Sequence, residues 1–206
     1  MRRSFVRSQA YAFLTVLLWA STYVFTRIVL EHFSIAVLAF LRCAAASLFL
    51  AFVLAVARPG VPELKAAVPR FLLVGAAGFA LYMPVFNKAS MALNATTGCI
   101  VMAMSPIMTA LLALGLFKER LNGGQWLAIG LAFSGILVMT LWNGTVVTTA
   151  GIAWMLLAAV CISAHNILQR GLTPRYGSLR VTAYGFFAGA LLLSPFLPEA
   201  AAQVGA

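Results

Sequence analysis

The sequence predicts an all-α integral membrane protein with seven transmembrane helices. Of its 206 residues, 63% are hydrophobic and only 9% are charged, whereas a soluble domain is about 45–50% apolar and about 25% charged. Seven apolar runs each approach the roughly 20 residues that a helix needs to cross a bilayer core. The short connectors between these runs leave no room for a soluble catalytic or regulatory domain.

The first apolar run, Ala10–Leu30, follows a basic leader and could be mistaken for a signal peptide. It is longer than a typical signal core and has no small-residue cleavage site at its far end, so we interpret it as a span. The other six runs are Ser34–Ala57, Pro69–Asn87, Ala95–Phe117, Gln125–Trp142, Ala150–Gln169 and Leu179–Leu197.

The basic residues predict the orientation of the chain. Lys88 is alone on one side, and Arg27 and Arg42 lie inside runs. The other eleven fall on the opposite side, in alternate connectors: Arg2, Arg3, Arg7, Arg58, Lys65, Arg70, Lys118, Arg120, Arg170, Arg175 and Arg180. Because cytoplasmic loops are rich in Lys and Arg, this asymmetry predicts a cytoplasmic N-terminus and an external C-terminus.

Composition also argues against several classes of partner. The net charge of +10 is dispersed between apolar runs, without the basic stripe of a nucleic-acid-binding protein. Cys43, Cys99 and Cys161 each lie inside an apolar run, with no CxxC pair and no cluster of His beside them. We therefore predict no nucleic-acid partner, no metal site and no cofactor.

A weak internal repeat is visible in the sequence. The segment SIAVLAFLRCAAASL, from Ser34, aligns without gaps to SLRVTAYGFFAGALL, from Ser178. A repeat unit of five helices would follow, and an odd number of helices inverts the second copy across the membrane.

Several motifs, in order, resemble one family. Trp19, Ala20 and Ser21 lie in the first run, and Leu41 and Arg42 in the second. Ser105 and Pro106 lie within the fourth run, and Glu119, Arg120 and Leu121 follow that run, before Gln125 and Trp126. Over about 130 residues this order and spacing resembles the EamA-type unit of the drug/metabolite transporter superfamily.

The resemblance implies a transporter of ten helices, arranged as two inverted five-helix repeats around a central cavity that exports small metabolites. The chain supplies one complete repeat and two helices of an inverted second repeat, so we expect a truncated second repeat, or a homo-oligomer that closes the cavity. The expected divisions are a cytoplasmic tail (1–9), the first repeat (10–142), an external connector (143–149), the partial second repeat (150–197) and an external tail (198–206).

Polar and small side chains within the runs gather on single helix faces. One interpretation is close packing between helices, and the other is a solute cavity, where Trp, Tyr and Met suit an organic solute better than a bare ion. The faces are Thr15, Trp19, Thr22 and Thr26; Gly98, Met102, Ser105 and Thr109; and Trp154, Ala158, Cys161 and His165. Our substrate-cavity candidates are Trp19, Thr22, Arg42, Tyr82, Asn87, Met102, Ser105 and His165.

Arg42 is the most informative charge, because it lies about 12 Å into the second run at 1.5 Å per residue. A cation at the centre of a membrane helix costs about 2.5–3.5 kcal/mol, so Arg42 should face protein or water. It either pairs with Glu31 or helix carbonyls, or it binds a substrate carboxylate. Arg27, near its helix end, should extend to the interface.

His165 and Pro106 carry two further hypotheses. Histidine is the side chain whose ordinary pKa lies near neutral pH, so His165 is either a hydrogen-bonded structural residue or, with Glu31, a candidate proton carrier in coupled transport. Pro106 removes a backbone hydrogen bond in the fourth run, which predicts a kink and a candidate hinge, and Pro84 is a weaker candidate.

The prediction is therefore a secondary transporter in the inner membrane that exports small organic solutes, such as amino-acid-like ones. Its partners would be the lipid bilayer and the solute. One alternative is a truncated or accessory membrane protein without transport activity. A remote alternative is an intramembrane serine hydrolase, because Ala132–Ile136 reads AFSGI and His165 could act as the base for Ser134.

Overall fold

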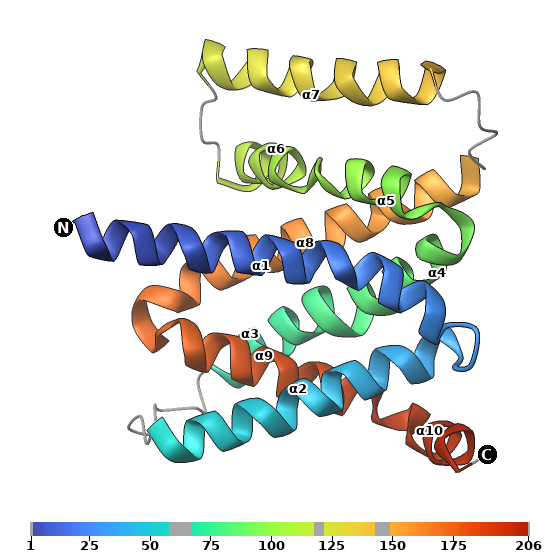
Figure 1. Cartoon of the computed structure of the whole chain (residues 1–206). Coiled ribbons are helices and arrows are strands. Elements are labelled where there is room, and N and C mark those ends of the chain that lie inside the picture. Colours follow the sequence, from blue (N-terminus) through green and yellow to red (C-terminus); the bar gives the residue numbers. More distant parts are fainter. Residues whose placement is uncertain (1, 58–66, 118–121, 143–148, 206) are drawn as a thin grey trace.

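The structure of the protein is a computed structural model that describes residues 2–57, 67–117, 122–142 and 149–205, and every element in these ranges is helical (Figure 1). The elements are α1 (Arg2–Val29), α2 (Ile35–Ala57), α3 (Val68–Gly75), the π-helix η1 (Ala76–Leu81), α4 (Tyr82–Ala92), α5 (Ala95–Met102), α6 (Ser105–Phe117), α7 (Gly123–Trp142), α8 (Thr149–Tyr176), α9 (Ser178–Leu193), the 3-10 turn η2 (Ser194–Phe196) and α10 (Leu197–Val204).

Six helical stretches among the described residues are long and apolar enough to cross a membrane. They are Gln9–Val29, Ile35–Ala57, Val68–Ala92, Ala95–Leu116, Ala150–Tyr176 and Ser178–Val204. The expected fifth span coincides with α7, which has 20 residues but is not one of the six. The all-helical membrane fold is confirmed in this coarser form, and the count of seven spans stays a prediction.

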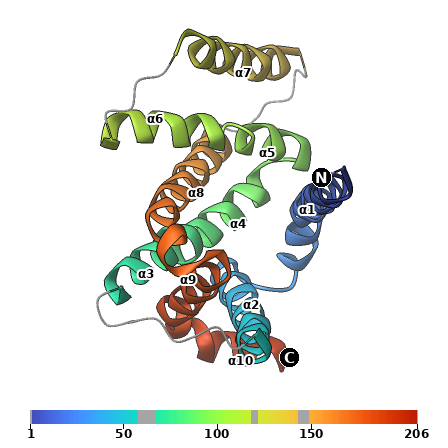
Figure 2. The same ribbon diagram turned by 90° about the vertical axis from the view of Figure 1, so that its left-hand side faces the viewer.

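The third stretch, α3–η1–α4, lies at the centre of the packing. It contacts α8 along α4 and α9 along α3 and η1, and α2 packs against both α9 and α4. Figure 2 shows α8 running from α5 and α6 down to α3 and α9. The main apolar core is therefore built from α2, η1, α4, α5 and α8.

Two prolines explain where the long helices change geometry. A proline inside a helix cannot bond to the carbonyl four residues earlier, and its ring crowds that carbonyl. For Pro84 that carbonyl is in Ala80, within the π-helix, and for Pro106 it is in Met102, the last residue of α5. The fourth run is thus divided at Ala103 and Met104, with Pro106 as the second residue of α6.

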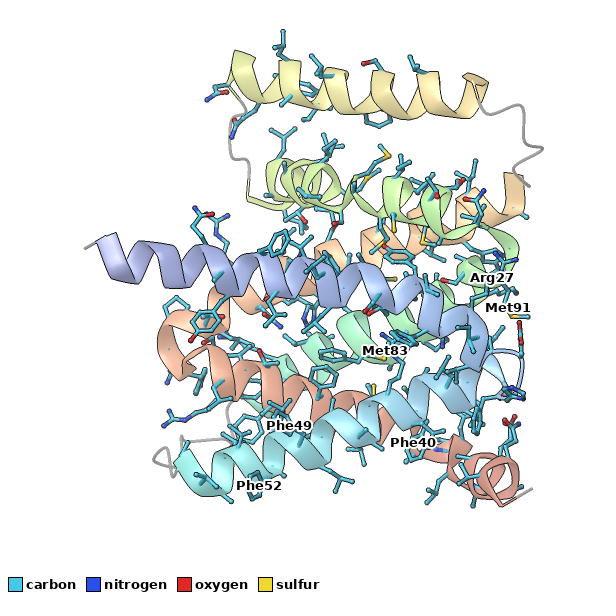
Figure 3. The ribbon with its side chains drawn as sticks, in the orientation of Figure 1. Arg27, Phe40, Phe49, Phe52, Met83 and Met91 are labelled. Carbon is cyan, nitrogen blue, oxygen red and sulfur yellow. The ribbon has the colours of Figure 1, made fainter. Side chains whose placement is uncertain are left out.

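The outer faces of the helices are apolar, as a lipid environment requires. Phe49 and Phe52 on α2 are 65% and 67% exposed (Figure 3). The described side chains of α7 are almost all exposed, and Leu127 and Leu131 are among the apolar ones. Figure 3 also shows Arg27 of α1 and Met91 of α4 at the same end of the molecule, as spans that alternate in direction should place them.

The expected external tail is partly helical in the structure. After η2 the chain forms α10, which packs against the start of α2. The Gln203 side chain accepts a hydrogen bond from the backbone N–H of Ser34 at 2.9 Å, and Ser34 in turn caps α2 by accepting from the N–H of Val37. This contact joins the last described segment to the loop between α1 and α2.

Candidate functional site

A cavity of about 230 Å³ lies between α1 and α2, and we call it the α1–α2 cavity. One helix face of α1 and one turn of α2 form its walls. Its lining residues are Thr22, Phe25, Thr26, Val29, Leu38 and Arg42. Thr22, Phe25, Thr26 and Val29 recur at helical spacing, so a single face of α1 presents two hydroxyls and two apolar side chains.

Arg42 is the charged group of this cavity. Its side chain is half-buried, and Nη1 donates to Thr26 Oγ1 at 3.3 Å, which is longer than a strong N–H···O bond. Thr26 is the partner that the structure provides, rather than the Glu31 expected as one alternative. A guanidinium has five N–H donors, so most of them remain available to a group inside the cavity.

A second polar site, around His165, is tightly closed. His165 is 6% exposed, its Nδ1 lies 2.9 Å from the Val74 carbonyl oxygen, and its Nε2 lies 2.6 Å from Gln169 Nε2. Because a carbonyl only accepts, Nδ1 carries a proton and donates it. In this arrangement Nε2 accepts from the Gln169 amide, so both ring nitrogens are occupied.

Glycines allow this close approach around η1. A Cβ added to Gly78 would collide with the His165 ring, and one added to Gly189 would fall 2.5 Å from Phe79 Cβ. Phe79 stacks on Phe186 of α9, with ring centroids 3.9 Å apart. We call this contact of η1 with α8 and α9 the glycine seam; its glycines are Gly75, Gly78, Gly185 and Gly189.

The other sequence candidates occupy different environments. Trp19 is 52% exposed, so it lies outside the α1–α2 cavity, whereas Tyr82 and Met102 belong to the core. Asn87 is fully buried; its Nδ2 donates to the Ile35 carbonyl oxygen at 3.0 Å and its Oδ1 has no hydrogen-bond partner. The backbone carbonyl of Ser105 accepts from Ser163 Oγ at 2.8 Å. Only Thr22 and Arg42 of the eight candidates therefore line the cavity.

The structure does not assemble the Ser–His pair of the hydrolase alternative. Ser134 Oγ donates to the Leu131 carbonyl oxygen at 2.8 Å on an exposed part of α7. Both nitrogens of His165 are engaged by Val74 and Gln169. A general base needs a free nitrogen within reach of the nucleophile, and this geometry does not provide one.

Sequence reasoning missed several residues that the structure brings together. Phe25, Val29 and Leu38 line the cavity, but isolated apolar residues in an apolar run give no signal. Gly78 was also missed, because its partner His165 lies on a different span. The spacing of Thr22 and Thr26 was the one available clue to the cavity face.

The six helical stretches that are long and apolar enough to cross a bilayer indicate a multi-pass membrane protein. Comparison with known families places the chain more narrowly: residues 7–141 match the EamA-like transporter family, and the protein belongs to this family. The resemblance seen in the sequence motifs is thereby confirmed.

Two individual relatives of the chain are named as an exporter and a transporter, in agreement with the family match. The chain is 32% identical over 189 residues to the probable terminal-alkyne amino-acid exporter of Streptantibioticus cattleyicolor, covering 90% of this chain and 62% of that protein. It is 27% identical over 199 residues to the uncharacterized transporter YdfC of Bacillus subtilis, covering 96% of this chain and 65% of that protein. This chain thus spans less than two thirds of the length of either relative. No solved structure matches it.

Proposed function

We propose that the protein is a secondary transporter that exports small organic solutes, and that Arg42 in the α1–α2 cavity binds an anionic group of the solute. The observation that carries this proposal is a charged side chain inside a membrane span, beside a cavity, with a hydroxyl as its hydrogen-bond partner. Intramembrane arginines are costly and usually mark solute or ion pathways.

Family membership supports the transport half of the proposal. One relative is named as an exporter of an amino acid, which fits the expected class of amino-acid-like solutes. We further propose an inner-membrane location with a cytoplasmic N-terminus, and the division of the chain into a first repeat (10–142) and part of an inverted second repeat (150–197). Rocking of such repeats around a cavity would provide alternating access.

The test is an export assay on cells or vesicles that contain the Arg42→Gln variant. We expect export to fall by about tenfold or more at normal membrane abundance, because a hydrogen bond to a charged group contributes about 1.5–3 kcal/mol. Arg70→Gln is the matched control, since Arg70 is an exposed arginine at the start of α3. Unchanged export by Arg42→Gln would remove Arg42 from the mechanism.

The proposed orientation has its own test. Arg70 and Met91 are exposed residues near opposite ends of the Val68–Ala92 stretch. In a variant without the three native cysteines, Arg70→Cys should react with a membrane-impermeant thiol reagent only from the cytoplasmic face, and Met91→Cys only from the external face. Labelling of both from one face would disprove the topology.

A further inference from the structure

We infer that the α1–α2 cavity selects a small organic anion: a solute that carries a carboxylate without an ammonium group is bound and moved in preference to the amino acid of the same carbon skeleton. This inference rests on the proposed function: it keeps the anionic group that Arg42 binds, and it assigns a solute without the ammonium group of an amino acid. It follows from the charges that line the cavity, from the charges that are missing from it, and from its size.

The cavity lining has one sign of charge. Arg42 provides a full positive charge, Thr22 and Thr26 provide hydroxyls, and the other three lining residues are apolar. A guanidinium presents parallel N–H donors that match the two oxygens of a carboxylate. The lining is thus complementary to an anionic head with a short apolar tail.

No carboxylate balances Arg42 within the described residues. Glu31 is exposed in the turn after α1 and does not line the cavity, and Glu199 accepts a hydrogen bond from Gln203 on α10. Tyr82 and Cys43 are near Arg42, and a phenol and a thiol are neutral at ordinary pH, so neither supplies a compensating charge. Glu63 and Glu119, the other acidic residues of the chain, lie outside the described residues.

An ammonium group would find poor partners in this cavity. Entering it means losing water and coming close to Arg42, and a like charge nearby disfavours a charged group. The hydroxyl proton of Thr22 is donated to the Leu18 carbonyl oxygen, so Thr22 can offer a lone pair but no charge. Phe25 offers a phenyl face, which is a weaker cation–π partner than the indole of Trp. A zwitterion therefore gains the contact of its carboxylate with Arg42, but losing water from its ammonium group beside a like charge costs free energy.

The volume of the α1–α2 cavity favours a small solute. Sites for drug-sized ligands have volumes of about 300–1,000 Å³, and this cavity, which is open on one side, has a volume of about 230 Å³. Phe25, Val29 and Leu38 give the apolar part of the solute a short wall to contact. A branched monocarboxylate of a few carbons fits this description better than a large amphipathic compound.

Two solutes with one carbon skeleton test the inference: 4-methyl-2-oxopentanoate, a 2-oxo acid, and leucine. The full chain would be reconstituted in vesicles of neutral phosphatidylcholine, with protein-free vesicles as the blank. We expect the 2-oxo acid to leave about tenfold faster than leucine, the ratio that 1.4 kcal/mol of differential binding produces. Arg42→Gln should abolish the preference, Arg42→Lys should retain most of it, and Arg70→Gln should leave it unchanged.

A binding measurement separates this inference from the proposed function. The 2-oxo acid should raise the thermal midpoint of the protein in detergent and leucine should not, and Arg42→Gln should remove the difference. This binding result without export would defeat the proposed function but retain the selectivity of the cavity. Equal, Arg42-dependent export of both solutes would overturn the inference and leave the proposed function intact.

The anionic group that binds Arg42 could also belong to a lipid headgroup, and one further experiment distinguishes a lipid from a solute. The selectivity assay would be repeated in vesicles that contain an anionic phospholipid. The inference expects the Arg42-dependent preference in neutral vesicles. An effect of Arg42→Gln that appears only with the anionic lipid would overturn the inference, because the ligand of Arg42 would then be the lipid.

Discussion

The α1–α2 cavity and the glycine seam show two opposite ways of placing polar groups inside membrane helices. In the seam, His165 has both ring nitrogens bonded, and glycines bring the helices into contact around it. In the cavity, a full charge has one long hydrogen bond and open space beside it. Small residues and satisfied polar groups hold membrane helices together, whereas an incompletely paired charge is costly to keep. The comparison therefore favours a structural role for the seam and supports the proposed binding of a solute in the cavity.

The largest effect on stability is expected from a substitution of Gly78 in the glycine seam. A Cβ at this position would collide with the His165 ring, and the ring cannot retreat without losing its hydrogen bond to the Val74 carbonyl. We expect Gly78→Ala to lower the free energy of unfolding by at least about 3 kcal/mol, the upper part of the range for overpacking. Thermal unfolding in detergent and the yield of monodisperse protein would measure the loss.

Gly171→Ala is the matched control for this substitution. Gly171 lies on α8, and an added Cβ there meets no atom within 4 Å. Replacing a helical glycine by alanine at an open site should leave stability unchanged or slightly raised. If Gly78→Ala were as stable as Gly171→Ala, η1 and α8 would not be in close contact.

His165 gives the second prediction. His165→Ala leaves the Val74 carbonyl and the Gln169 amide without this partner, and a buried unsatisfied polar group costs about 1–3 kcal/mol. His165→Asn should recover part of the loss, because its amide N–H can reach the position of Nδ1. Unfolding curves of the two variants measure this difference.

A role in proton coupling predicts a different outcome for the same variants. If His165 is structural, the folded fraction of His165→Asn should export solute with the pH dependence of the wild type. Loss of that pH dependence, with stability retained, would instead support the proton-carrier hypothesis. His165 would then have a role in transport rather than in stability.

The sequence predicts local features of both regions better than their tertiary contacts. The expected run Ser34–Ala57 coincides with α2, and the kink expected at Pro106 falls where α5 gives way to α6. These features depend on apolar length and on a missing N–H, which are properties of the chain within a few residues. The hydrogen bond from His165 to Val74 joins residues 91 positions apart, and periodicity within one helix contains no information about it.

The threonine face of α1 shows the same limit within one helix. Spacing placed Thr15, Trp19, Thr22 and Thr26 together, but only Thr22 and Thr26 line the cavity. Thr15 and Trp19 are exposed and are not among the lining residues. A repeat of 3.6 residues defines a face, whereas the neighbouring helix decides how much of that face becomes a site.

In the α1–α2 cavity, a substitution of Thr26 should have a smaller effect than the substitutions in the seam. Thr26→Val removes the acceptor of the Arg42 hydrogen bond, and because this bond is long, at 3.3 Å, we expect it to contribute about 0.5–1.5 kcal/mol rather than the roughly 1.5–3 kcal/mol of a short bond to a charged group. We expect the apparent affinity for solute to fall by about threefold, with unfolding nearly unchanged. Thr15→Val, on the same helix but outside the cavity, is the control. Equal effects of the two substitutions on the apparent affinity would argue against a role for Thr26 in solute binding.

Pro106 gives the smallest expected effect on stability and tests whether the break between α5 and α6 moves. Pro106 is exposed, and Pro106→Ala restores an N–H that can bond to the Met102 carbonyl. If the break is a hinge, a more continuous helix should lower the maximal export rate and shift the solute concentration for half-maximal export with it, because hinge substitutions often change both parameters. Export measured across solute concentrations separates the two parameters, with Pro195→Ala, at the exposed η2 turn, as the control. A Pro106→Ala variant with the wild-type rate would mean that the break is a fixed bend, and alternating access would then have to arise elsewhere in the bundle.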